Sequence, residues 1–145
     1  MKKFKLTSEF IVDISGVKLF RIKALIEFGN VKAGDLGGYI EKEENLSHMG
    51  NAWVSGNAQV SGDAQVFGDA RVSGDKDYAY AHGFGSCNRT TTFFRLKDGD
   101  VGVRCGCFYG TLAQFRDKVC ETHGETKKAQ EYLMLADLME IRFKN

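Results

Sequence analysis

Residues 52–75 read AWVSGNAQVSGDAQVFGDARVSGD and contain one six-residue unit four times. Each unit has the form Ala-x-Val-x-Gly-Asn/Asp, so the segment is an internal repeat. Ala and Val stand two positions apart and therefore point to the same side of an extended strand. Gly followed by Asn or Asp allows a sharp corner before the next strand. Because such short strands cannot bury a face alone, the repeat predicts a coiled chain in which each rung pairs with the next.

The repeat frame extends backwards in a weaker form. Ile40 and Leu46 take the Ala position of two earlier units, while Lys42 and His48 replace the valine. A lysine in an inward slot is unusual in a core and is typical of a frayed end. We therefore expect a coil of about two turns whose first units are irregular.

The repeat is flanked by two segments of different character. Residues 10–22 alternate around a glycine-bearing turn, which predicts a β-hairpin. Residues 90–96 and 101–108 predict a second pair of strands, and Thr111 with Gln114 has the form of a capping box that opens the first of two helices. We expect a mainly β fold with α, in three parts: an N-terminal β-hairpin cap over 1–38, a hexapeptide-repeat β-helix over 39–85 and a ββαα domain over 86–145.

Three motifs precede the clean repeats: Phe20–Leu25, Asp35–Glu41 and Glu44–Ser47. With the hexads, they resemble the YdcK-type or polymer-forming β-helix proteins of phages and enteric bacteria. That resemblance covers residues 17–75, and the segments Cys105–Thr111 and Glu121–Gly124 resemble a module of small phage proteins. The resemblances imply a left-handed coil with three hexads per turn and a trimeric assembly. They imply no particular activity, because fold alone does not determine function.

Five residues are candidates for binding a ligand or partner. If three hexads make a turn, Trp53 lies beside Arg71 at roughly 4.8 Å, as a surface staple or as part of a binding patch. Phe67 replaces a serine found in the other units, so it contacts another subunit or packs beneath the C-terminal domain. Arg104 and Tyr109 offer a cationic and an aromatic contact, or are a solvated arginine and a core tyrosine.

Histidine is the residue on which an enzymatic interpretation depends. A hexapeptide-repeat acyltransferase needs a general-base histidine beside a groove, and a zinc enzyme of that fold needs three histidine ligands. Only His48 lies in the extended frame, and His82 lies just outside it. A histidine at the position of His48 is more often a polar cap on the end of a short core than a catalytic general base. We therefore expect no catalytic residue.

The cysteines raise the possibility of a zinc site. Cys105 and Cys107 share one face of a strand, and Cys120 and His123 are one helical turn apart. Four ligands of the type that zinc prefers would converge if strand and helix pack together. Small buried thiols explain the same pattern, and we favour that interpretation. We therefore expect no metal and no other cofactor.

The overall charge excludes a general attraction to polyanions. Twenty basic and nineteen acidic residues give a net charge of +1, so nucleic acid binding is weakly supported. No segment has the form of a signal peptide or a spanning helix, so we expect a cytoplasmic protein of a bacterial host cell, with reduced thiols and no membrane contact.

These observations favour a non-enzymatic, homo-oligomeric binding protein of phage or prophage type, with a trimer preferred. It would inhibit a host defence factor or hold a small ligand between protomers. An acyltransferase-like enzyme and a structural assembly subunit are the two alternatives.

Overall fold

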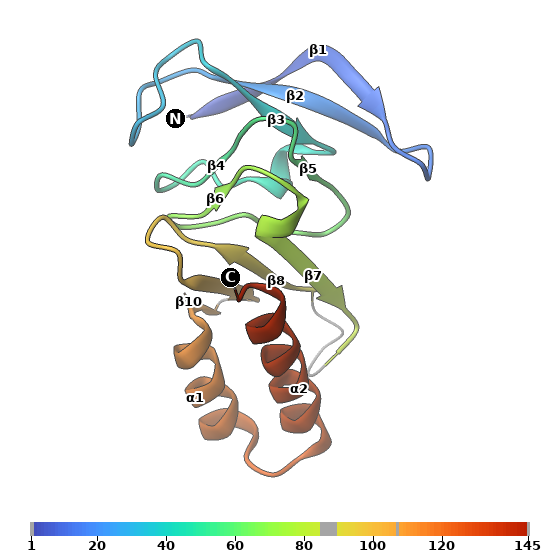
Figure 1. The fold of residues 1–145 in the computed structure, drawn as a ribbon, viewed down its shortest axis with the longest axis vertical. Helices are drawn as coiled ribbons and strands as arrows, with labels where there is room; N and C mark the ends of the chain where they lie inside the picture. Colours follow the sequence, from blue (N-terminus) through green and yellow to red (C-terminus); the bar gives the residue numbers. More distant parts are fainter. Residues whose placement is uncertain (1, 85–89, 107, 145) are drawn as a thin grey trace.

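The computed structural model describes residues 2–84, 90–106 and 108–144. It shows a mixed β protein with several sheets and a pair of C-terminal helices. Three parts follow one another along the long axis: an N-terminal sheet, a coiled middle segment, and a C-terminal sheet covered by the helices (Figure 1).

The N-terminal part contains the expected hairpin. Strands β1 (Phe4–Val12) and β2 (Lys18–Ala24) pair in antiparallel fashion. Their turn is closed by Asp13, whose carboxylate accepts hydrogen bonds from the backbone amides of Ser15 and Val17. Strand β3 (Leu36–Ile40) continues this sheet beside β2 and pairs in parallel with β5 (Gln59–Val60) of the repeat. The hairpin sheet therefore runs directly into the coil.

The repeats form a short parallel coil. Strand β4 (Trp53–Val54) pairs with β6 (Arg71–Val72), and Trp53 lies opposite Arg71, as the eighteen-residue spacing predicts. Two further parallel pairings join Ile40 to Val60 and Leu46 to Val66. The inward side chains of all three pairings are at most 1% exposed, so they form the core of the coil.

The predicted frame for the first units is wrong by two residues. Ile40 and Leu46 align with Val60 and Val66, so they take the valine position and not the alanine position. The pairing offset is 20 residues there but 18 at Trp53, which places two extra residues between Leu46 and Trp53. The short η1 helix (Glu43–Asn45) lies earlier in the same turn.

This shift changes the positions of Lys42 and His48. Neither occupies an inward valine slot, because Ile40 and Leu46 fill those slots. The Lys42 side chain is 40% exposed and pairs with Asp63. The expected frayed end is therefore a complete rung with an apolar interior.

The C-terminal sheet has four strands where two were expected. Its order is β10-β9-β8-β7, and all neighbours are antiparallel. The strands are β7 (Tyr78–His82), β8 (Thr90–Arg95), β9 (Val101–Cys105) and β10 (Phe108–Thr111). Strand β7 follows the η2 helix (Asp75–Asp77) at the end of the repeats. Its Tyr-Ala-Tyr-Ala-His sequence lacks the repeat signature, and nothing in these residues predicts that β7 pairs with β8.

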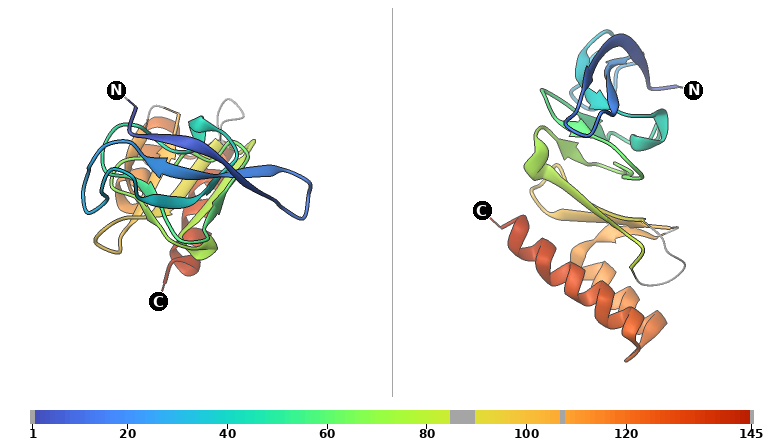
Figure 2. Two further views of the ribbon diagram at one scale, coloured as in Figure 1. Left: turned by 90° about the horizontal axis from the view of Figure 1, so that it is seen from above. Right: turned by 90° about the vertical axis from the view of Figure 1, so that its right-hand side faces the viewer.

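Adjacent phenylalanines join the coil to the helices. Successive residues of a strand point to opposite faces, and both Phe93 and Phe94 of β8 are fully buried. Phe93 packs in the core shared with helices α1 (Leu112–His123) and α2 (Lys127–Arg142), whereas Phe94 packs in the core of the coil. The sheet is therefore the middle layer between coil and helices (Figure 2).

The opposite end of the coil is covered by the N-terminal sheet. Phe4 and Ile22 are fully buried in the coil's core. Lys3 is only 1% exposed, and its ammonium group donates hydrogen bonds to the carbonyl oxygens of Ala52 at 2.7 Å and Gly50 at 3.3 Å. No helix in the described part of the chain is long and apolar enough to cross a membrane.

Candidate functional site

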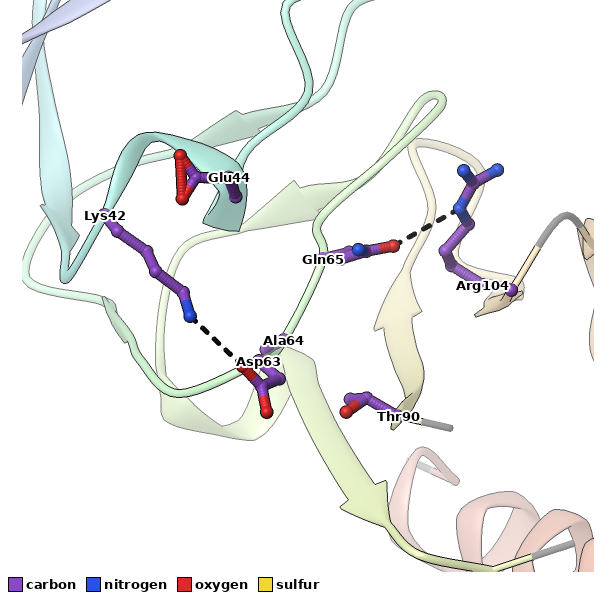
Figure 3. A pocket seen from close by; sticks show the side chains of 8 residues that line it. Lys42, Glu44, Asp63, Ala64, Gln65, Thr90 and Arg104 are labelled. Carbon is purple, nitrogen blue, oxygen red and sulfur yellow. Dashed lines mark hydrogen bonds and ion pairs between the residues drawn. The ribbon is translucent and has the colours of Figure 1, made fainter. Parts of the chain in front are cut away.

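A polar groove lies where the coil meets the C-terminal sheet. It consists of two adjoining cavities with volumes of about 500 Å³ and 300 Å³. Glu44, Gln65 and Arg104 line both cavities. Glu44 comes from η1, Gln65 from the third clean hexad and Arg104 from β9, so three parts of the chain form the groove (Figure 3).

Two predicted binding residues, Phe67 and Arg104, lie at this groove, and a third, Tyr109, packs beside Phe67 without lining it. The Arg104 guanidinium carbon lies 4.3 Å from the centre of the Phe67 ring, a cation–π contact. Phe67 and Tyr109 form an edge-to-face pair with ring centres 5.0 Å apart. Arg104 and Tyr109 are themselves opposite each other in the pairing of β9 with β10. Phe67 therefore packs against the C-terminal domain, which was one of the two alternatives.

Arg104 is held in place and has donors that no described residue uses. Its Nε donates to the side-chain oxygen of Gln65 at 3.4 Å (Figure 3). Its terminal nitrogens form no hydrogen bond or ion pair with the described residues. Contact with Phe67 and Gln65 orients the guanidinium without neutralising its charge.

The acidic groups of the groove differ in their partners. Asp63 pairs with Lys42 at 3.1 Å, and this hydrogen bond raises the pKa of Lys42 above its ordinary value. Glu44 is exposed and forms no hydrogen bond or ion pair with the described residues. The larger cavity therefore contains one ion pair, Lys42–Asp63, together with a carboxylate and a guanidinium that lack charged partners among the described residues.

Trp53 and Arg71 lie away from this groove. The expectation that Trp53 lies on the surface is wrong: it is only 6% exposed, and its ring meets Phe28 edge to face at 5.3 Å. The loop before β3 covers it. Arg71 donates to the backbone oxygen of Asn51 at 2.9 Å. The pair is thus a packing feature beneath the N-terminal sheet.

His48 lies at the edge of the smaller cavity, where its ring is firmly packed. It stacks on Phe4 with ring centres 4.2 Å apart, and its Nδ1 accepts a hydrogen bond from the Lys3 amide. The proton of the neutral ring is therefore on Nε2, which lies 3.3 Å from a Glu43 oxygen. Nε2 is buried, and its contact with Glu43 lacks the geometry of a hydrogen bond, so the ring packs as a structural cap.

Glu43 also pairs with Lys2 at 3.1 Å. The hydrogen bond with Lys2 is the main cause that lowers the pKa of the Glu43 carboxyl, and His48 adds to it.

Of the three cysteines in the possible zinc site, Cys105 and Cys120 lie among the described residues. Cys105 is buried, with its sulfur 3.3 Å from the Thr91 hydroxyl and 3.7 Å from that of Tyr132, as expected for a core thiol. Cys120 is exposed on α1, and Cys107 lies outside the described residues. Within the described ranges, no three His, Cys, Asp or Glu residues are grouped as metal ligands.

Glu44, Gln65 and the Lys42–Asp63 pair were not predicted as site residues. Gln65 occupies an outward hexad slot two residues before Phe67, which was the available signal. The contribution of Glu44 depends on the irregular turn at η1, which the repeat pattern does not predict. No family model matches the chain, and no curated protein matches it.

Proposed function

We propose that this protein is a binding protein and that it holds its ligand or partner in the groove between coil and C-terminal sheet. The observation that carries this proposal is the convergence of Glu44, Gln65 and Arg104 at one groove from three separate segments, with Phe67 in cation–π contact with Arg104. A charged group fixed by rigid neighbours can bind without a large loss of side-chain entropy. The coil and sheet then act as a scaffold for that surface.

From the resemblance to phage β-helix proteins we further propose a left-handed coil and a homotrimer. The protein would act in the cytoplasm of a bacterial host, where it inhibits a host factor or sequesters a small ligand. The parallel rungs eighteen to twenty residues apart support a coil of three short sides per turn. Because both ends of the coil are covered within one chain, we expect a trimer to form through the sides of the coil.

Native mass spectrometry of the protein purified from bacterial cells tests this function. We expect the unaltered protein to retain an additional mass that Arg104→Glu loses, because the substitution reverses the charge in the groove. Arg116→Gln is the matched control, since Arg116 pairs with Asp137 and Glu140 on the helices. Loss of the ligand in both variants, or retention in both, would contradict the proposal. The same spectrum counts the subunits.

A further inference from the structure

The groove presents opposite charges on either side of Gln65. Arg104 lies on one side and Glu44 on the other (Figure 3). Among the described residues, neither the terminal nitrogens of Arg104 nor the Glu44 carboxylate has a hydrogen-bonding partner. The Gln65 oxygen accepts from Arg104, and its side-chain amide nitrogen, which donates to no described residue, can donate to a ligand. The order across the groove is therefore cation, amide donor, anion.

We propose that the groove binds a short peptide through both of its termini. The C-terminal carboxylate pairs with the terminal nitrogens of Arg104, which suit a bidentate carboxylate contact. The N-terminal ammonium pairs with Glu44, and a peptide carbonyl between them accepts from Gln65. This ligand class rests on the proposed binding function and makes it more specific.

The surrounding charges disfavour a polyanion. Lys42 is the other cation that lines the larger cavity, and Asp63 neutralises it at 3.1 Å. Glu44 lines both cavities without a charged partner among the described residues and would repel a phosphate chain, whereas Glu43 is paired with Lys2. A ligand with only a positive charge would leave Arg104 unpaired. A ligand that carries one charge of each sign at separate ends satisfies both groups.

Glu44 and Arg104 do not simply neutralise each other. Arg104 is directed by the Phe67 ring and by Gln65, and Glu44 belongs to the short η1 helix on the other side. A bridging ligand must therefore be long enough to span the groove. Each added residue of an extended peptide contributes up to about 3.5 Å, so peptide length measures this span.

Glycine and its oligomers from diglycine to pentaglycine are suitable probes because they differ only in length. Their binding is followed through the backbone amide signals of ¹⁵N-labelled protein by NMR titration. We expect affinity to rise with length to an optimum. At that length, N-acetylation or C-terminal amidation should weaken binding about 10- to 100-fold, because each removes one charge-assisted contact.

Two variants assign each terminus to its residue. Glu44→Gln should bind the free and the N-acetylated peptide equally, and Arg104→Gln should bind the free and the amidated peptide equally. Arg116→Gln should bind like the unaltered protein. Equal binding of capped and free peptides to the unaltered protein, or no binding by any oligomer, overturns the peptide proposal. Such a result leaves the broader function intact if native mass spectrometry still finds a ligand that depends on Arg104.

Discussion

Lys3 is a buried cation within the cover of the coil. Its ammonium lies 4.6 Å from the centre of the Phe28 ring and donates to two backbone carbonyls. Burial, followed by repulsion from Arg71, lowers the pKa of Lys3 from 10.5 to about 8. The folded state therefore disfavours the protonated form of Lys3, even though its ammonium group is hydrogen-bonded.

The lowered pKa of Lys3 predicts a pH dependence of stability. Between pH 8 and 10.5 the unfolded chain binds more protons at this residue than the folded chain does, so its contribution to the free energy of unfolding rises with pH. Below pH 8 both states are protonated and the full cost is present. Urea unfolding across this range should show a steeper rise for the unaltered protein than for Lys3→Met. Parallel pH profiles would contradict the burial of the charge.

Gly68 is a corner glycine with two constraints. Its φ is +67°, and a Cβ at this position would overlap the Tyr109 hydroxyl. Gly68→Ala should therefore lower the free energy of unfolding by about 1–3 kcal/mol. Gly74→Ala is the matched control, because Gly74 holds the same hexad position with φ −163° and open space around it. Chemical denaturation measures both, and equal losses would mean that Tyr109 does not pack over Gly68.

At the scale of elements, helix α1 begins at a complete capping box. The Thr111 hydroxyl accepts from the Gln114 amide at 3.2 Å, and the Gln114 side chain accepts from the Thr111 amide at 2.9 Å. Thr111→Ala should cost about 1 kcal/mol of stability, measured by thermal unfolding. Thr122→Ala, an exposed change inside the same helix, should leave stability equal or slightly higher because alanine favours helix. If Thr122→Ala were less stable than Thr111→Ala, the Thr111 side chain would not stabilise the start of α1.

At the scale of the whole molecule, strand β8 packs against both coil and helices, so we expect them to unfold as one cooperative unit. The protein has a single tryptophan, Trp53 in the coil, whereas the helices dominate circular dichroism at 222 nm. Phe94→Leu should cost about 1–2 kcal/mol. Both signals should shift together, because Phe94 packs on the coil while its neighbour Phe93 packs on the helices.

The control for this experiment is Met134→Ala, a truncation of a side chain that is 71% exposed. It should move neither transition. If Phe94→Leu shifts the fluorescence transition and leaves the dichroism transition in place, the coil and the C-terminal domain unfold separately.

The amino-acid sequence alone determined the elements that depend on interactions between residues close together in the chain. The hexad spacing predicts the short parallel rungs and the pairing of Trp53 with Arg71. Alternation around a glycine turn predicts the first hairpin, and Thr111 with Gln114 predicts the start of α1. These features depend on strand periodicity, positive φ and capping, which the neighbouring residues set.

The tertiary structure decided the features that depend on contacts between segments far apart in the sequence. The two extra residues after Leu46, the place of β7 in the C-terminal sheet and the burial of Trp53 follow from which segments pack together. The groove has the same origin, because Glu44 and Arg104 are sixty positions apart and only packing of coil on sheet brings them to one surface. A periodic pattern places side chains on one face of one element. The fit between faces of different elements selects which of them meet.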